Sequence, residues 1–194
     1  MSNPIWNHVQ LASEMACDTF LSSGDESLDL FLGGGLPLPG VSLWTGSLGS
    51  RAREVLLKWV VSQQKNSQCV LWVLGLPSVQ ILASSWASRG VDLSKLYFSY
   101  SSCPLAEIKE VFFSDIFPLI ILDSIVFSNE DQAFLSQIAR RKEKSLVMLQ
   151  NQNIGIQSAH PTIRHKVSVG SAGSDSAVLK HNERSYRITF EPAR

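Results

Sequence analysis

The stretch GVSLWTGSLGSRARE, residues 40–54, decides the fold. The apolar run 41–44 predicts a buried strand, the glycines and serines after it predict a turn, and residues 52–65 have the apolar spacing of an amphipathic helix. A strand, a glycine-containing turn and a helix in this order form the setting of a phosphate-binding loop, because backbone N–H groups at a helix start point at the anion. The stretch therefore raises the question of whether a nucleotide binds here.

The side chains that a phosphate-binding loop needs are missing from this turn. Such a loop ends in a glycine, a lysine and a magnesium-binding hydroxyl. Counted from Gly46, these positions hold Arg51, Ala52 and Arg53; shifted by one residue, Arg51 takes the lysine position but Ser50 replaces the glycine and Ala52 the hydroxyl. A structural turn is the interpretation that we favour. Nucleotide binding without hydrolysis is the second interpretation, and an active ATPase is the third.

Length and composition place limits on the rest of the chain. With 194 residues we expect an N-terminal amphipathic helix and linker in residues 1–24 and a single core domain in residues 25–194. The 17 basic and 17 acidic side chains cancel, so net charge indicates no partner. Apolar runs are shorter than the roughly 18 residues of a membrane span, and no secretory signal is recognised, so we expect a cytoplasmic protein without membrane contact. Cys17, Cys69 and Cys103 lack metal-site spacing and are expected to be small core residues.

Strand and helix patterns alternate to about residue 150, and strands alone follow. This order predicts an α/β fold with three layers: a mostly parallel sheet, helices on both of its faces and an antiparallel C-terminal edge. Helices are expected at residues 5–21, 28–32, 52–65, 78–90, 104–113 and 130–144, and strands at 41–44, 69–75, 95–100, 118–124, 145–152, 164–169, 176–180 and 184–190, with 33–40 as a loop.

Two surfaces are candidates for contact with a partner. Ile5, Trp6, Val9 and Phe20 form one helical stripe that either packs on the core or docks into a partner groove. The basic residues at the end of the expected helix 130–144 and in the tail either form a solvated surface or contact single-stranded DNA, weakly, or a protein partner. These basic residues are Arg140, Arg141, Lys142 and Lys144, followed by Arg164, His165, Lys166, Lys180, Arg184 and Arg187.

The histidines suggest no chemistry of their own. His8, His160, His165 and His181 show no metal-ligand or general-base pattern, and we expect them at the surface. No metal site is therefore predicted.

Over most of its length the chain resembles bacterial RecA. The segments that carry the resemblance are SSGDESLDLFLGGGLP, CVLWVLG, SRGVDLSKLYFSY, PLIILDS and SLVMLQNQ, in the RecA order. The resemblance implies a RecA-like fold. In that fold Asp123 corresponds to the aspartate on the magnesium side of the nucleotide, and Asn151 and Gln152 correspond to the Asn-Gln pair that senses the nucleotide. It also marks Gly46, Ser50, Arg51, Ala52, Asp123 and Gln152 as a vestigial nucleotide site. Asp123 has a second interpretation, as a strand-end carboxylate that caps the next helix.

The departures from RecA argue against an enzyme. RecA carries a catalytic glutamate just after its second strand, where this chain has LGLP at residues 74–77. The segments matching the two DNA-binding loops are short, and no stretch of these 194 residues resembles the RecA C-terminal domain. An ATPase needs positioned phosphates and a group that orients water, so we expect no ATPase activity and no cofactor.

Among RecA-like proteins without an ATP site, the chain is most similar to the ImuA family, with the related SulA family second. The ImuA resemblance implies an adaptor in DNA repair and SOS translesion synthesis that binds RecA, an ImuB-type polymerase subunit, or both. The SulA resemblance implies an inhibitor of cell division that binds FtsZ. A third hypothesis is a RecA paralogue that uses Arg51, Asp123 and Gln152 to bind ATP together with single-stranded DNA.

Overall fold

The computed structural model describes residues 19–47, 49–77, 81–107, 109–151, 159–163, 165–173 and 175–190. The strands are β1 (Thr19–Leu21), β2 (Leu36–Leu38), β3 (Gly40–Gly46), β4 (Val70–Leu74), β5 (Leu96–Tyr100), β6 (Leu119–Asp123), β7 (Ser145–Asn151), β8 (His165–Ser171), β9 (Ser176–His181) and β10 (Arg184–Thr189). The α-helices are α1 (Glu26–Phe31), α2 (Ala52–Lys65), α3 (Ala83–Ala87), α4 (Pro104–Glu107), α5 (Lys109–Phe113) and α6 (Asn129–Arg141), and Leu93–Lys95 forms a 3-10 turn.

Eight strands form one mixed sheet in the order β10-β9-β8-β3-β7-β6-β4-β5. The pairs from β8 to β5 are all parallel, whereas β9 and β10 add to β8 in antiparallel fashion. The prediction of an α/β fold with a mostly parallel sheet and an antiparallel C-terminal edge is confirmed. The first tail strand, β8, joins β3 in parallel, so the antiparallel part begins only at β9.

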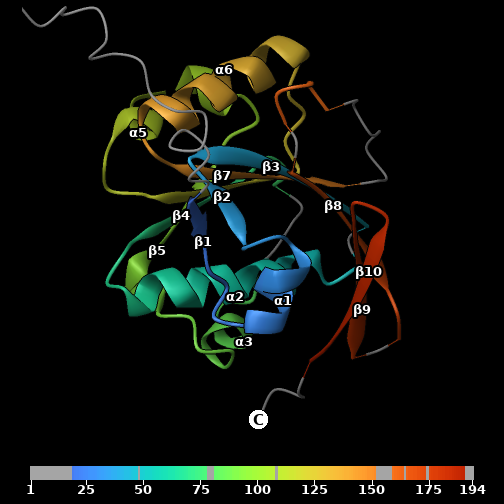
Figure 1. Ribbon diagram of the computed structural model, residues 1–194. Coiled ribbons are helices and arrows are strands. Elements are labelled where there is room, and N and C mark those ends of the chain that lie inside the picture. Colours follow the sequence, from blue (N-terminus) through green and yellow to red (C-terminus); the bar gives the residue numbers. More distant parts are fainter. Residues whose placement is uncertain are drawn as a thin grey trace, which may run out of the picture.

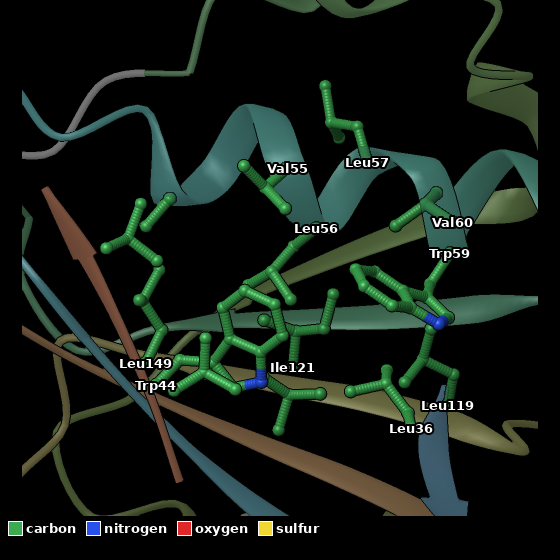
Figure 2. Close-up of a cluster of buried hydrophobic side chains, with 14 of the residues drawn as sticks. Leu36, Trp44, Val55, Leu56, Leu57, Trp59, Val60, Leu119, Ile121 and Leu149 are labelled. Carbon is green, nitrogen blue, oxygen red and sulfur yellow. The ribbon is translucent and has the colours of Figure 1, made fainter. Parts of the chain in front are cut away.

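Helices lie on both faces of the sheet, with α1, α2 and α3 on one side and α5 and α6 on the other (Figure 1). Figure 2 shows α2 directing apolar side chains onto the strands below it, where Trp44 of β3 and Trp59 of α2 meet with ring centroids 5.6 Å apart. The four α2 residues expected to point inward, Val55, Leu56, Trp59 and Val60, are all fully buried. Burial of each large apolar side chain contributes about 1.5–3 kcal/mol, so this face fixes α2 against the sheet.

The opposite face of the sheet is covered by α6. Leu135, Ile138 and Ala139 of this helix are buried against Val41 and Leu43 of β3, among other residues. The helix begins with a capping box, in which the Ser128 hydroxyl accepts from the Asp131 N–H and the Asp131 carboxylate accepts from the Ser128 N–H. Its last residue is Arg141, so the expected extension to Lys144 is wrong.

The N-terminal part of the described chain differs from the prediction. Thr19–Leu21, expected to end a helix, forms strand β1, and it pairs in antiparallel fashion with β2, which lies inside the expected loop 33–40. The pairing is held in place by the core, because the Trp59 indole N–H donates to the Leu21 carbonyl at 2.9 Å. Phe20 is therefore a half-buried strand residue. The other residues of the expected helical stripe, Ile5, Trp6 and Val9, lie outside the described residues.

Two further expectations are corrected by the structure. The helix expected at residues 78–90 is represented in the described residues by the short α3, and Leu82 before it is exposed. Cys103 is also exposed rather than a core residue, while Cys69 is half-buried.

Candidate functional site

The carboxyl ends of β3, β6 and β7 meet beside the first turn of α2, which is where open α/β sheets bind their ligands. A cavity of about 320 Å³ lies at this edge. The residues that line it are Gly46, Ser47, Gly49, Arg51, Ala52, Arg53, Glu54, Trp86, Ser124, Leu149, Gln150 and Asn151. The turn that follows Gly46 therefore borders a cavity.

Asp123, the last residue of β6, is fully buried behind this cavity and is bonded on both carboxylate oxygens. Arg53 of α2 donates two hydrogen bonds to this carboxylate, from Nε to Oδ2 at 2.6 Å and from Nη2 to Oδ1 at 2.8 Å. The Trp72 indole N–H donates to Oδ2 at 3.1 Å, and the Ser124 hydroxyl donates to Oδ1 at 2.9 Å. A carboxylate offers about four acceptor positions, so these four donors use its whole capacity.

The position of Arg53 has a direct chemical consequence. Counted from Gly46, Arg53 stands where a phosphate-binding loop has its magnesium-binding hydroxyl, and its guanidinium supplies the positive charge beside Asp123. Magnesium requires oxygen ligands at close to octahedral geometry, and both oxygens of Asp123 are already bonded to donors. The residues present therefore do not fit a magnesium ion at this place.

The expectation that Asp123 caps the following helix is wrong. The next long helix, α6, has Ser128 as its N-cap, and the donors to Asp123 come instead from α2, β4 and Ser124. The carboxylate, at the end of β6, holds the start of α2 to β6 and to the middle of β4, and its contact with Arg53 joins residues that are 70 positions apart.

The turn between β3 and α2 is closed by its own bonds. The Ser50 hydroxyl and the Ser50 N–H both donate to the Ser47 carbonyl, at 2.7 and 3.0 Å. Ser50 is fully buried, and a methyl group placed on Gly46 would collide with its hydroxyl. Arg51 has a φ of 62°, a left-handed conformation that favours glycine. These features support the interpretation of residues 46–52 as a structural turn.

Two of the residues that line the cavity, Arg51 and Glu54, are linked to side chains from distant parts of the chain. Arg51 and Arg89 both pair with Glu54, at 2.9 and 3.1 Å. The same two guanidinium groups lie over the ring of Phe190, 5.1 and 5.9 Å from its centroid. Arg89 and Phe190 are far apart in the sequence from residues 40–54, so no local pattern could have indicated them.

The structure thus separates the six residues of the expected vestigial site. Gly46, Arg51 and Ala52 line the cavity, while Ser50 lies buried beneath the turn. Asp123 is sealed behind Arg53, and Gln152 lies outside the described residues. Two β7 residues, Gln150 and Asn151, line the cavity as well, and the side-chain oxygen of Gln150 is buried without a hydrogen-bond partner among the described residues.

The four basic residues at the end of α6 and just after it differ in their exposure and in their partners. Arg140 and Arg141 are exposed, whereas Lys142 pairs with Asp115 at 3.5 Å. Lys144 is buried and donates to the carbonyls of Ser114 and Phe117, the latter at 2.7 Å, and burial lowers its pKa. Lys144 is therefore a structural residue and not a surface contact, because its ammonium replaces water at two backbone acceptors.

In the tail, Lys166 of β8 and Arg187 of β10 are exposed as expected, and Arg164 lies outside the described residues. The surface prediction is wrong for His165 and His181, which are buried with ring centroids 4.7 Å apart. Burial, with a smaller contribution from the neighbouring His181, lowers the pKa of His165 to about 4. His165 is therefore a neutral packing residue at pH 7.

No protein-family model matches this sequence, and no curated protein matches it either. Within the described ranges, no cluster of three or more histidine, cysteine or acidic side chains could hold a metal ion. None of the helices in those ranges combines the length and the apolar character needed to cross a bilayer.

Proposed function

We propose that this chain is a RecA-like protein that does not hydrolyse ATP and serves as an adaptor in DNA damage tolerance, in the manner of the ImuA family. The observation that carries the proposal is the pair between half-buried Arg53 and buried Asp123, in which an arginine is bonded to the carboxylate that a RecA-type ATPase uses on its magnesium side. The partners in this proposal are RecA, an ImuB-type polymerase subunit, or both.

Three features together support the loss of hydrolysis. Asp123 has no acceptor position left, as described above. The segment LGLP after β4 carries no acid, and the backbone of Gly75 within it is packed against Ser124, its N–H donating to the Asp123 carbonyl at 2.8 Å. Hydrolysis needs both positioned phosphates and a group that orients water. Without these elements we expect the fold to be kept and ATP hydrolysis to be lost.

The core itself is intact, and this favours an interaction protein. Trp44, Trp59 and Trp72 are fully buried, and the strands on both sides of the cavity keep continuous parallel pairing. A well-packed scaffold with a filled metal position still presents its surfaces to partners. The choice of pathway and partner depends on the resemblance to the ImuA family, because a fold by itself does not define a function.

Affinity capture tests the partner. The purified full-length chain is immobilised and is expected to retain purified RecA or a purified ImuB-type subunit. Purified FtsZ is applied in parallel as the alternative partner. Retention of FtsZ alone would replace the proposal by a division inhibitor of the SulA kind. Retention of none of the three proteins would overturn the adaptor role.

A second experiment tests the chemistry. Titration with a fluorescent ATP analogue and magnesium is expected to give no saturable magnesium-dependent signal, and steady-state ATP turnover is expected to stay at the level of buffer. Turnover that disappears in Asp123→Asn would overturn the proposal. Saturable binding that is lost in Arg51→Ala would favour the nucleotide-binding paralogue instead.

A further inference from the structure

The strands β8, β9 and β10 have one apolar face and one cationic face. Val167, Val169, Ala177, Leu179 and Ile188 belong to the main core cluster. On the same strands Lys166, Lys180 and Arg187 are exposed. The strands therefore complete the core on one side and present basic side chains on the other.

The strand register places these three cations on a single face. Lys180 is paired with Ser168 on one side and with Ser185 on the other, and paired residues share a face. Lys166 lies two residues before Ser168, and Arg187 lies two residues after Ser185. Because side chains alternate with a period of two, Lys166, Lys180 and Arg187 point in the same direction. As diagonal neighbours they lie within reach of one another along one line across three strands.

The cationic face is on the α6 side of the sheet. Lys166 is paired with Leu43 of β3, which packs in the core under α6. In Figure 1, β9 and β10 lie at the side of the molecule, with α1 close to their other face. Phe31 of α1 stacks on Tyr186 of β10 with centroids 5.4 Å apart, so α1 covers the apolar face. Exposure of the three cations shows that their own face is open among the described residues.

Acidic side chains do not balance this face. The other residues that share it are Ser168, Gly170, Ser176, Val178, Ser185 and Thr189, which are neutral. Asp175 and Glu183 lie in the turns at the ends of the strands. None of the three cations forms an ion pair with a residue that the structure describes. The face thus has a positive potential even though the whole chain is neutral.

We infer that this face, defined by Lys166, Lys180 and Arg187, binds the phosphate backbone of single-stranded nucleic acid. Charge complementarity carries the inference, since three unpaired cations and several hydroxyl groups match a chain of phosphates. The cations follow one line, which fits one backbone rather than the two of a duplex. Exposed aromatic anchors, which protein interfaces use, do not occur among the described residues of this face. The inference does not depend on which protein the chain contacts.

The binding is weak and depends strongly on salt. For three phosphate contacts to a single strand, the slope of log K against log salt is about −2, so a fourfold rise in salt lowers the affinity roughly twentyfold. Each lost contact reduces the slope by about 0.7.

Fluorescence anisotropy with a labelled thymidine homopolymer and a labelled uridine homopolymer tests the inference. The wild-type chain is expected to bind at 50 mM salt and to lose about twentyfold in affinity at 200 mM. The variant Lys166→Gln, Lys180→Gln, Arg187→Gln is expected to lose binding at both salt concentrations. The control is Lys65→Gln with Arg184→Gln, because both residues are exposed and Arg184 lies on β10 but on the opposite face of the strand from Arg187.

Each outcome decides the matter. Binding of either polymer that the triple variant loses and the control keeps supports the inference, and the two polymers distinguish DNA from RNA. Equal binding by wild type and triple variant overturns it, as does the absence of wild-type binding at 50 mM salt. If the triple variant loses capture of a protein partner while the wild type binds neither polymer, the face contacts an acidic protein surface and the inference is wrong. Capture of RecA or the polymerase subunit by the triple variant, with loss of polymer binding, keeps the two proposals separate.

Discussion

The start of α2 and the outer face of β8–β10 are both basic, but their cations have different surroundings. At α2, Arg53 is bonded to buried Asp123, and Arg51 is paired with Glu54. On the tail strands, Lys180 and Arg187 are exposed and form no ion pair within the described residues. A buried charge without its partner is costly, whereas an exposed one is solvated. The comparison indicates that the first group holds the fold and that the second is available to a partner.

The largest effect on stability is expected where buried Asp123 loses its partner. Arg53→Met leaves the Asp123 carboxylate buried without a cation, and we expect it to lower the free energy of unfolding by about 3–5 kcal/mol in urea denaturation. Lys142→Met is the control, because its pair with Asp115 is exposed and contributes about 0–1 kcal/mol.

The double variant Arg53→Met, Asp123→Leu sharpens this result. Removing both charges is expected to restore much of the stability that the single variant loses, since no unpaired charge stays buried. Strict additivity of the two single changes, or a loss below about 1 kcal/mol for Arg53→Met, would show that the pair does not hold α2 to the sheet.

The second effect is a dependence of stability on pH, which arises from buried His165 in the tail strand β8. The pKa of His165 is about 4 in the folded protein and 6.5 without burial. Between these values the unfolded chain binds more protons, so stability is fully present above pH 6.5 and falls as the pH drops toward 4. The loss amounts to roughly 3 kcal/mol for the whole interval.

Denaturation midpoints measured from pH 7 to pH 4 check this prediction. His165→Leu is expected to flatten the pH dependence, whereas His160→Gln, at a half-exposed position, is expected to leave it unchanged. A pH dependence of His165→Leu equal to that of the wild type would contradict the assignment of His165 as a buried neutral side chain.

The turn before α2 gives the third effect. Gly46→Ala brings a methyl group against the Ser50 hydroxyl, and we expect it to destabilise the protein by about 1–3 kcal/mol. Gly49→Ala is the matched control in the same turn, because a methyl group there meets no atom within 4 Å. Thermal unfolding of the two variants measures the difference. Similar melting temperatures would mean that the turn is loose enough to adapt to a ligand.

The smallest effect on stability is expected on the cationic face. Lys180→Gln and Arg187→Gln change only exposed side chains, so the free energy of unfolding is expected to stay within about 0.5 kcal/mol of the wild type. Urea denaturation provides the measurement. A larger loss would show that these cations support the fold, and it would remove the contrast with Arg53.

Local patterns predicted most of the elements. The apolar spacing of residues 52–65 predicted α2 with the bounds that the structure gives, and the buried runs predicted β4, β6 and β7 within two residues at either end. Strands β1 and β2 were missed. Each has three residues, and each exists because the other one pairs with it across the intervening α1, which no window of sequence reports.

The candidate site was predicted only in part, for the same reason. The strand–turn–helix order identified the turn at Gly46. Counting from Gly46 placed Arg53 at the position of the magnesium-binding hydroxyl, but no pattern in the sequence indicated what Arg53 contacts. Its bond to Asp123 depends on β6 lying beside β4 in the sheet, which brings residues 70 positions apart into contact.

By itself the sequence determined the alternation of strands and helices from residue 41 onward, the mostly parallel type of the sheet and the absence of a lysine and a hydroxyl from the two positions where a phosphate-binding loop needs them, because these follow from periodicity and residue identity within short windows. Only the tertiary structure decided which charged or titratable side chains are buried or paired within the protein and which are exposed. Lys144 and His165 are buried and the half-buried Arg53 is paired with buried Asp123, whereas Lys166, Lys180 and Arg187 remain exposed on one face. The physical reason is that burial and pairing of a charge depend on strand register and on packing between distant segments, and neither of these is a local property of the chain.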